Sequence, residues 1–265
     1  MVTGYYEPLI EGSRLRSEAY PWPIHGVPAD MLTIDLGEVH PDLRNMRLRG
    51  RLEGNRVVPY WSRAELERLD GGLPAPVLLW AADPIDLFFL QVQGSGQVRL
   101  PDGSRVRIGY ADQNGHPYRS IGRWLIDRGE LTLENASMQG IRAWADANPH
   151  RLRELLNTNP SYVFFRELPT DGEGPIGAMG LPVSAGRSIA IDPSHVPLGA
   201  PVFLDTTYPL SDRPLRRLVL AQDTGGAIKG RVRVDFFWGF GAPAGEQAGR
   251  MRQQGRKWVL LPRED

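Results

Sequence analysis

Two aspartates, one on each side of a glycine turn, have the residue type and spacing for acid–base chemistry. Asp223 follows the apolar run Leu218–Ala221, which is typical of a short buried strand. A sharp turn is expected next, because Gly225 and Gly226 allow backbone angles that other residues avoid. Asp235 then follows in a second predicted strand. Paired carboxylates of this kind are the groups that glycosidases and aspartic proteases use.

The strand that carries Asp235 is predicted from alternating residues after the glycine turn. One predicted face carries Val232, Val234 and Phe236, and the other carries Arg231, Arg233, Asp235 and Phe237. Asp235 therefore lies beside side chains that point into a core, and it could share a cleft with Asp223. A solvated aspartate paired with Arg233 is the alternative, since Asp-Thr-Gly-Gly is also a good turn sequence.

The triplet Asp223-Thr224-Gly225 also matches the Asp-Thr-Gly of aspartic proteases. That chemistry needs two facing carboxylates that share one proton. Because the chain contains one such triplet, a protease would have to be a homodimer. The protease is therefore a distant alternative.

Composition argues against several classes of function. The 265 residues include 31 Lys and Arg and 31 Asp and Glu, so the net charge gives no electrostatic case for nucleic acid. The absence of cysteine excludes disulfides, thiolate ligands and a thiol nucleophile. Asp83 and Asp86 interrupt the most apolar stretch, so no run approaches membrane-spanning length. His116 has no companion ligands at suitable spacing, so we predict no metal site and no cofactor.

The pattern along the rest of the chain predicts short strands around a helical middle, which is an α+β arrangement. Predicted strands cover 2–9, 31–36, 77–80, 87–92, 108–111, 162–165, 189–192, 202–204 and 258–261, and residues 98–107 are predicted to form a hairpin that turns at Asp102-Gly103. Predicted helices cover 62–69, 120–129, 138–147, 149–156 and 244–254. Residues 14–28 are expected to form a loop, and Ser62-x-x-Glu65 is a capping box.

Several stretches in chain order match the signatures of one family. They are TGYYEP from Thr3, QVQGSG from Gln91, NGHPYRSIG from Asn114, NPSYVFF from Asn159, and AQDTGGAIKG with VDFFWGFG around the two aspartates. Together they resemble the membrane-bound lytic transglycosylase A (MltA) family, which cleaves peptidoglycan and has a C-terminal three-aspartate (3D) domain. The matches cover nearly the whole chain.

The resemblance implies a mostly β (α+β) fold with two domains. Residues 1–10 and 112–265 would form a double-psi β-barrel domain that includes a helical segment around 118–158. Residues 11–111 would form a second, smaller inserted β domain. A deep groove between the domains would hold a glycan strand.

The resemblance also implies an activity. The protein would be a peptidoglycan lytic exotransglycosylase that cleaves the β-1,4 bond between N-acetylmuramic acid and N-acetylglucosamine and forms 1,6-anhydro-N-acetylmuramic acid. Asp235 would act alone as acid and then base, supported by Asp223 and Asp192. Two alternatives stay open: a hydrolytic glycosidase that uses Asp223 as a second carboxylate, and a non-catalytic peptidoglycan-binding protein.

Substrate-binding residues are also implied by the resemblance. They are Thr3, Gly4, Tyr5, Tyr6, Gln93, Gly94, Ser95, Gly96, Gly225, Gly226, Lys229 and Trp238. From the residues alone, a hairpin turn is the favoured reading of Gly94-Ser95-Gly96. The tyrosines and Trp238 are equally well half-buried core aromatics.

Partners and location follow from the same resemblance. Peptidoglycan glycan strands are the expected partner, other cell-wall enzymes are further candidates, and the protein is expected to be a monomer. The family implies the periplasmic face of the bacterial envelope, with an outer-membrane lipoprotein as the candidate full-length form. The sequence begins MVTGYY without an export signal, which by itself predicts a cytoplasmic protein.

Overall fold

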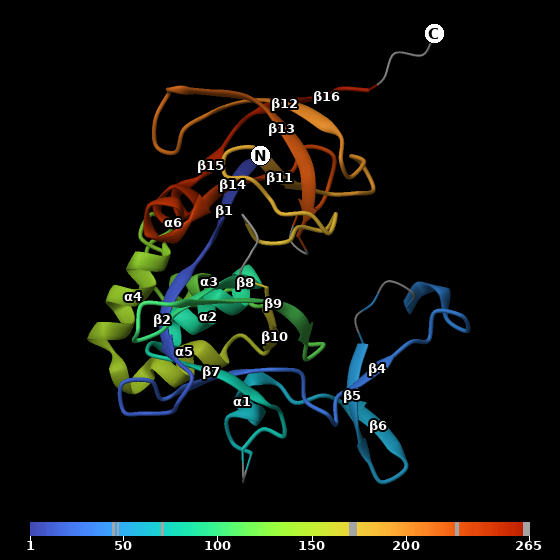
Figure 1. The fold of residues 1–265 in the computed structure, drawn as a ribbon, viewed down its shortest axis with the longest axis vertical. Helices are drawn as coiled ribbons and strands as arrows, with labels where there is room; N and C mark the ends of the chain where they lie inside the picture. Colours follow the sequence, from blue (N-terminus) through green and yellow to red (C-terminus); the bar gives the residue numbers. More distant parts are fainter. Residues whose placement is uncertain (44–45, 47, 70–71, 170–173, 226–227, 262–265) are drawn as a thin grey trace. The chain divides into compact units, whose positions relative to one another are not determined.

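The structure is a computed structural model that describes residues 1–43, 46, 48–69, 72–169, 174–225 and 228–261 (Figure 1). The chain divides into two compact units. One unit comprises Met1–Leu9, Ser95–Gln97 and Pro169–Asp265, and we call it the barrel unit. The other comprises Ile10–Gly94 and Val98–Leu168, and we call it the inserted unit.

The barrel unit is built on a seven-stranded sheet with the order β15-β1-β14-β11-β13-β12-β16. Its strands are β1 (Val2–Glu7), β11 (Ser188–Ile191), β12 (Pro201–Thr207), β13 (Pro214–Thr224), β14 (Val234–Phe240), β15 (Arg252–Gln253) and β16 (Arg256–Val259). Two pairs in this sheet, β1–β14 and β11–β13, are parallel. The N-terminal strand therefore shares a sheet with the C-terminal third of the chain, as the predicted double-psi β-barrel requires.

The core of the barrel unit comes from the alternation of its strands. On β13, Leu215, Val219 and Ala221 are buried, and they pack with residues of the neighbouring strands such as Ile189 and Phe236. Burial of these apolar side chains is the main term that stabilises the sheet.

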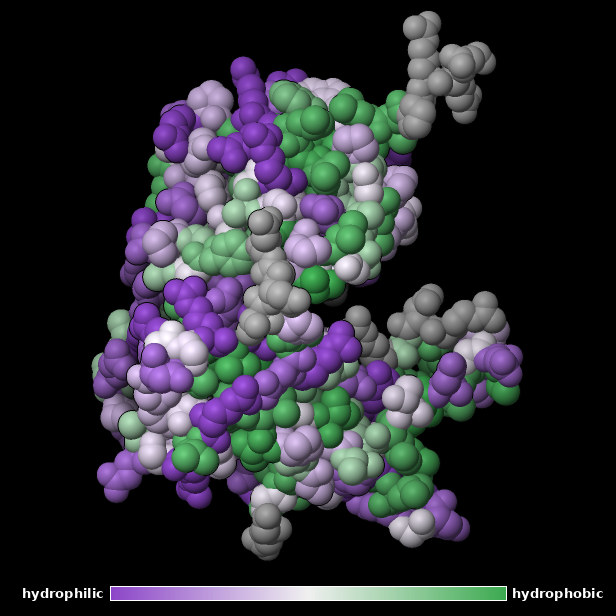
Figure 2. All heavy atoms as spheres, viewed as in Figure 1, coloured by the Kyte–Doolittle hydropathy of each residue, from purple (hydrophilic) through white to green (hydrophobic). Residues whose placement is uncertain are grey.

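Helix α6 (Gly241–Arg250) packs beside β1 and β14 (Figure 1). The strands at the edge of the sheet away from β1 have an apolar outer face. Leu218, Phe203 and Trp258 form one row across β13, β12 and β16. All three side chains are exposed, and Figure 2 shows hydrophobic residues gathered over these strands.

Most of a six-stranded sheet with the order β10-β9-β8-β2-β7-β3 belongs to the inserted unit. Its strands are β2 (Leu9–Ser13), β3 (Trp22–His25), β7 (Val77–Ala81), β8 (Ser95–Arg99), β9 (Arg105–Gln113) and β10 (Val163–Leu168). A separate three-stranded sheet consists of β4 (Leu32–Ile34), β5 (Leu48–Glu53) and β6 (Arg56–Pro59). The helical elements are η1 (Pro41–Leu43), α1 (Arg63–Leu66), α2 (Pro84–Gln93), α3 (Ile121–Asp127), α4 (Met138–Ala147), η2 (Pro149–Arg151) and α5 (Leu152–Asn157).

Helix starts in the inserted unit follow their capping residues. The side chains of Ser120 and Ser137 accept backbone N–H bonds at the starts of α3 and α4. Ser62 forms the predicted capping box with Glu65. The predicted helices 62–69, 120–129, 138–147 and 149–156 are therefore confirmed, although α1 itself spans only Arg63–Leu66.

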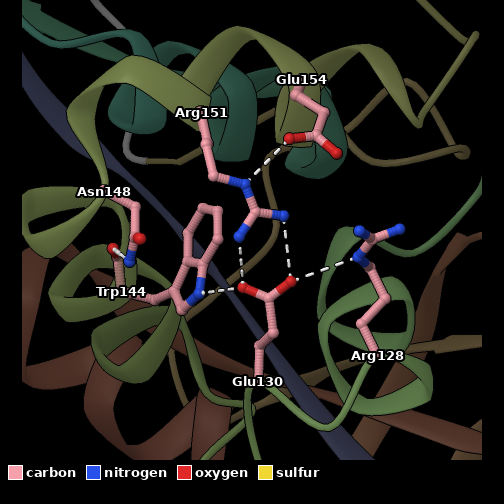
Figure 3. A network of polar contacts seen from close by, with 6 residues as sticks. All are labelled: Arg128, Glu130, Trp144, Asn148, Arg151 and Glu154. Carbon is pink, nitrogen blue, oxygen red and sulfur yellow. Dashed lines mark hydrogen bonds and ion pairs between the residues drawn. The ribbon is translucent and has the colours of Figure 1, made fainter.

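A polar network joins the elements around α4 (Figure 3). Both carboxylate oxygens of Glu130 accept hydrogen bonds from Arg151, and one also accepts the indole N–H of Trp144. Arg128 bonds the other oxygen. These bonds, led by those from Arg151, lower the pKa of Glu130 to about 2.

The structure corrects several predicted elements. Residues 87–92 belong to helix α2 and not to a strand, because Asp83 caps the helix and Pro84 occupies its first turn. The expected loop 14–28 contains strand β3. Strand β14 begins only at Val234, so Val232 lies in a turn and is 76% exposed. The last helix, α6, begins and ends earlier than predicted.

The compact units also have limits other than the predicted domains. The helices of residues 118–158 lie in the inserted unit and not with the barrel. The reason is that β9 and β10, which flank these helices in sequence, pair along their length in the sheet of the inserted unit. The inserted unit is consequently the larger of the two, and not the smaller as expected.

Candidate active site

Asp235 lies in the middle of the barrel sheet. On one side its strand β14 pairs in parallel with β1, where Thr3 is its register partner. On the other side β14 pairs with β11, where the partner is Ala190. Thr3 Oγ1 donates a hydrogen bond of 2.5 Å to Asp235 Oδ1. Neighbours in one row of a sheet point to the same face, so this contact follows from the register.

A β-bulge directs Asp223 to the same face as Asp235. Ile189 of β11 pairs with Ala221, and both belong to the core. The register shifts at the next residue, so that Ala190 pairs with Asp223 and one residue of β13 is extra. Without the shift, Asp223 would share the core face of Ala221, two residues earlier. With the shift, Asp223 and Asp235 flank Ala190 in one row.

Backbone amides hold the Asp223 carboxylate. Asp223 Oδ1 accepts the N–H of Thr224 at 2.8 Å and the N–H of Ala178 at 3.0 Å. The sequence does not predict the Ala178 contact, because no motif around Ala178 indicates that this segment lies near the end of β13. The sequence offers no signal for such a long-range backbone contact.

Burial raises the pKa of both carboxyl groups in the row. For Asp235, the hydrogen bond from Thr3 and the charge of Arg233 oppose this effect, and the charge of Asp223 adds to it. For Asp223, the N–H groups of Thr224 and Ala178 oppose it. Asp235 is therefore an acid whose protonated form the barrel favours, which is the property a general acid needs.

Asp192 has the opposite character. Its Oδ2 accepts the N–H of Gly230 at 2.7 Å, and its Oδ1 accepts the hydroxyl and the N–H of Ser194. These bonds, with the charge of Lys229, hold the pKa of Asp192 well below its usual range. The carboxylate thus connects the end of β11 to the segment before β14. Asp192-Pro193-Ser194 is a recognisable turn sequence, so the Ser194 contact could have been predicted.

Tyr5 lies on the same face as the two carboxylates. Its ring contacts Phe237, with centroids 5.0 Å apart. Its hydroxyl is buried and makes no hydrogen bond of normal geometry within the described residues. Burial raises the pKa of Tyr5, and the charges of Asp223 and Asp235 raise it further. Phe237 is fully buried, so this face of β14 does not fit the alternative of a solvated surface aspartate.

Trp238 and Gly4 lie on the opposite face of the sheet from Asp235. The indole N–H of Trp238 donates to Met251 Sδ at 3.2 Å, and its ring packs edge-on against Phe236. A Cβ at Gly4 would lie 2.5 Å from Trp238 Nε1 and 2.9 Å from the Cα of Ala248. These contacts favour core packing over sugar stacking for Trp238.

The remaining predicted binding residues are dispersed. Tyr6 lies against α6, because a Cβ at Gly245 would come within 2.9 Å of its ring. Lys229 is exposed, and its charge acts on Asp192. Gly225 packs against Ile228 within the turn. Gly226 lies outside the described residues.

The predicted turn at Gly94-Ser95-Gly96 is partly different in the structure. Gly94 adopts the left-handed conformation, with φ of 81°, and ends helix α2. Ser95 and Gly96 are already in strand β8. Gln93 is the last residue of α2, and its role in binding stays a prediction.

The site thus brings together Thr3, Tyr5, Asp223 and Asp235, all on one face of the barrel sheet. Such a group can transfer a proton at a partly buried carboxyl. No three His, Asp or Glu side chains in the described ranges are grouped as metal ligands would be.

Comparison with known proteins places this arrangement in a family. The family model for the MltA specific insert domain matches residues 1–166, and the model for the 3D domain matches residues 187–261. The chain belongs to the MltA family, and the predicted resemblance and fold class are confirmed.

Relatives and solved structures agree with this assignment. Membrane-bound lytic murein transglycosylase A of Escherichia coli K12 is 37% identical over 97% of this chain and 64% of its own length. The crystal structure of MltA from Neisseria gonorrhoeae is 44% identical, with a TM-score of 0.88 over 98% of this chain and 72% of that one. E. coli MltA with bound chitohexaose is 34% identical, with a TM-score of 0.77 over 97% and 70%. The chain thus spans less than two thirds of the length of the curated relatives it matches, 64% of the E. coli protein and 65% of the one from Vibrio cholerae.

Proposed function

We propose that this chain is a lytic transglycosylase that cleaves the β-1,4 bond between N-acetylmuramic acid and N-acetylglucosamine in peptidoglycan. The observation that carries the proposal is the partly buried Asp235, which is held by Thr3 and favoured in its protonated form. The names of the relatives support the reaction class. The chain spans 64% of the E. coli relative, so the main support for the activity is the site of this chain itself.

In the first step Asp235 donates its proton to the glycosidic oxygen, and the bond from this oxygen to the anomeric carbon of N-acetylmuramic acid breaks. In the second step the C6 hydroxyl oxygen of the same sugar bonds to the anomeric carbon, and its proton returns to Asp235. The products are an N-acetylglucosamine end and 1,6-anhydro-N-acetylmuramic acid. No water is consumed, and the internal nucleophile gains from its high effective concentration.

The geometry supports Asp235 as the residue that works alone. Its raised pKa keeps the proton available, and the row places the charge of Asp223 where it adds to this effect. Asp223 and Asp192 then serve as supporting residues, the first by charge and the second by holding the turn through Gly230. Gln93, Gly94, Ser95, Gly96, Lys229 and Gly225 are the candidate contacts to sugar.

We infer that the substrate is a peptidoglycan glycan strand and that the protein acts in the cell envelope, at its periplasmic face. Chitohexaose bound to the E. coli relative supports recognition of an amino-sugar chain, and the name "membrane-bound" of the relatives supports the location. Among the helices of the described ranges, none has the length and apolar character needed to cross a membrane. Lipid attachment and contacts with other cell-wall enzymes remain part of the proposal.

Mass spectrometry of digested peptidoglycan tests the reaction, with wild type and Asp235→Asn compared side by side. We expect 1,6-anhydro-muramic ends from wild type and a loss of at least about a hundredfold in Asp235→Asn, as for removal of a general acid. Asp235→Asn keeps the size of the side chain and an acceptor for Thr3, so its fold should be retained. Reducing-end products from wild type would contradict the proposal and favour a hydrolytic glycosidase. Intact glycan that sediments with both proteins would leave a binding protein.

A further inference from the structure

Thr3 has a role in the site besides its predicted contact with sugar. We propose that Thr3 is a positioning residue that holds Oδ1 of Asp235, so that the transferable proton is carried by the other carboxyl oxygen, Oδ2. This inference rests on the proposed function, because it assigns the proton of that reaction to one atom.

The hydrogen bond itself distinguishes the two carboxyl oxygens. Thr3 Oγ1 donates to Oδ1 at 2.5 Å, which is short for a hydroxyl and a carboxyl oxygen. Within the described part of the chain, no other hydrogen bond reaches the Asp235 carboxyl group. A carboxyl oxygen that already accepts a strong hydrogen bond is the poorer site for the acidic proton of the group. Oδ2 is therefore the oxygen that releases and recovers the proton.

The backbone around Thr3 is held from several sides. Strand β1 lies between β14 and β15, so that Thr3 is in register with both Asp235 and Arg252. Val2 is buried in the core, and Gly4 lies against Trp238 without room for a Cβ. Thr3 is β-branched, which further restricts the rotation of its side chain. A hydroxyl held in this way can fix the rotation of the carboxyl group opposite it.

The chemistry explains why this matters for a single acid. The same group must give a proton to the glycosidic oxygen and then take one from the C6 hydroxyl, so one oxygen has to face the reacting atoms in both steps. Rotation of the carboxyl group would exchange Oδ1 and Oδ2 and turn the proton away from the substrate. A displacement of about 1 Å at a reacting group is enough to reduce a rate about a hundredfold.

The chain offers matched variants. Thr3→Val removes the hydroxyl and keeps the shape, whereas Thr3→Ser keeps the hydroxyl and removes the methyl group. Thr206→Val is the control, because Oγ1 of Thr206 also donates a short bond, of 2.6 Å, to the carbonyl of Gln254 on a different part of the sheet.

The test is the pH profile of anhydro-muramic product formation, with thermal unfolding of every variant. In wild type, kcat/KM falls at high pH as Asp235 loses its proton. Thr3→Val should lower kcat by about tenfold or more. The same variant should move this falling limb to higher pH, because the ionised carboxylate loses a donor. Thr3→Ser should retain both the rate and the limb, and Thr206→Val should lose only stability.

Two results would overturn the inference: an unchanged limb in Thr3→Val, or a Thr3→Ser variant that behaves as Thr3→Val does. Failure of the proposed function has a different signature, since wild type itself would then form no anhydro product. In that case an NMR titration of the Asp235 carboxyl carbon tests the positioning role of Thr3 without an activity assay. The inference requires that Thr3→Val titrate at higher pH than wild type, whether or not the protein is active.

Discussion

Gly4 provides the sharpest stability prediction, because the structure leaves no room for a side chain there. In Gly4→Ala the added Cβ would lie 2.5 Å from Trp238 Nε1, 2.6 Å from Trp238 Cδ1 and 2.9 Å from the Cα of Ala248. Favourable carbon contacts are about 3.5–4.0 Å apart, so the methyl group overlaps its neighbours by about 1 Å on two sides. One of these neighbours is helix backbone, which cannot rotate away.

The indole cannot easily give way either. It is held by its bond to Met251 and by the ring of Phe236, whose centroid lies 5.0 Å away. Overpacking of a core costs about 1–3 kcal/mol, and contacts this close on two sides place Gly4→Ala near the upper end. For a chain of this size, about 3 kcal/mol corresponds to a fall of roughly 6–12 °C in Tm.

Differential scanning calorimetry measures this change, and Gly249→Ala is the matched control. Gly249 is exposed on the same helix α6, and a Cβ added there would meet no atom within 4 Å. Alanine there should stabilise the protein by about 0.5 kcal/mol, because glycine in a helix loses more entropy on folding. A Gly4→Ala protein as stable as wild type would refute the packing argument and return Gly4 to the candidate sugar contacts.

Other perturbations follow from the polar contacts. Glu130→Gln should destabilise the protein at pH 7 and have little effect near pH 2. The pKa of Glu130 is lowered to about 2 in the folded protein, so its stabilising effect is present above the pKa of the unfolded chain and is lost as pH falls through the pKa of the folded protein. Thermal unfolding measured against pH tests this, and a difference that does not depend on pH would contradict it. Asp192→Ala should speed tryptic cleavage after Lys229, read by mass spectrometry, because the carboxylate no longer holds the segment; unchanged cleavage would show that this bond does not restrain it. Arg63→Met should cost about 2–4 kcal/mol in urea unfolding, since the guanidinium is buried and its bond to Gln91 is lost; an unchanged midpoint would contradict this.

Local signals in the sequence were enough for much of the fold. Serine caps located the starts of α1, α3 and α4, and the apolar run before Asp223 located the end of β13. The apolar run 87–92 was misread because a buried helix and a buried strand look alike over so few residues. Asp83-Pro84, a capping residue followed by proline, was the signal that would have separated them.

The arrangement of the site depended on contacts that no local pattern carries. Alternation along β14 placed Asp235 on the face opposite Val234 and Phe236, and the structure agrees. Alternation along β13 would have placed Asp223 on the core face, because no pattern in the residues predicts the bulge. Pairing of β1 with β14 joins Thr3 to a residue more than two hundred positions away, and only the family resemblance indicated that the two ends of the chain meet.

The bulge also bears on whether the site has one working carboxylate or two. Asp223 and Asp235 are separated by one intervening strand, so their Cα atoms are about 10 Å apart, from two strand spacings of about 4.8 Å. Inverting glycosidases place their carboxyl groups about 6.5–9.5 Å apart, so distance alone does not exclude a second catalytic acid. The bonding of Asp223 is more decisive: its Oδ1 already accepts two backbone N–H bonds, and its pKa is raised by burial. These two bonds fix the orientation of the Asp223 carboxyl group at the end of β13, where its charge adds to the raised pKa of Asp235. A carboxyl group fixed in this way suits the supporting role, in which Asp223 acts on Asp235 through its charge.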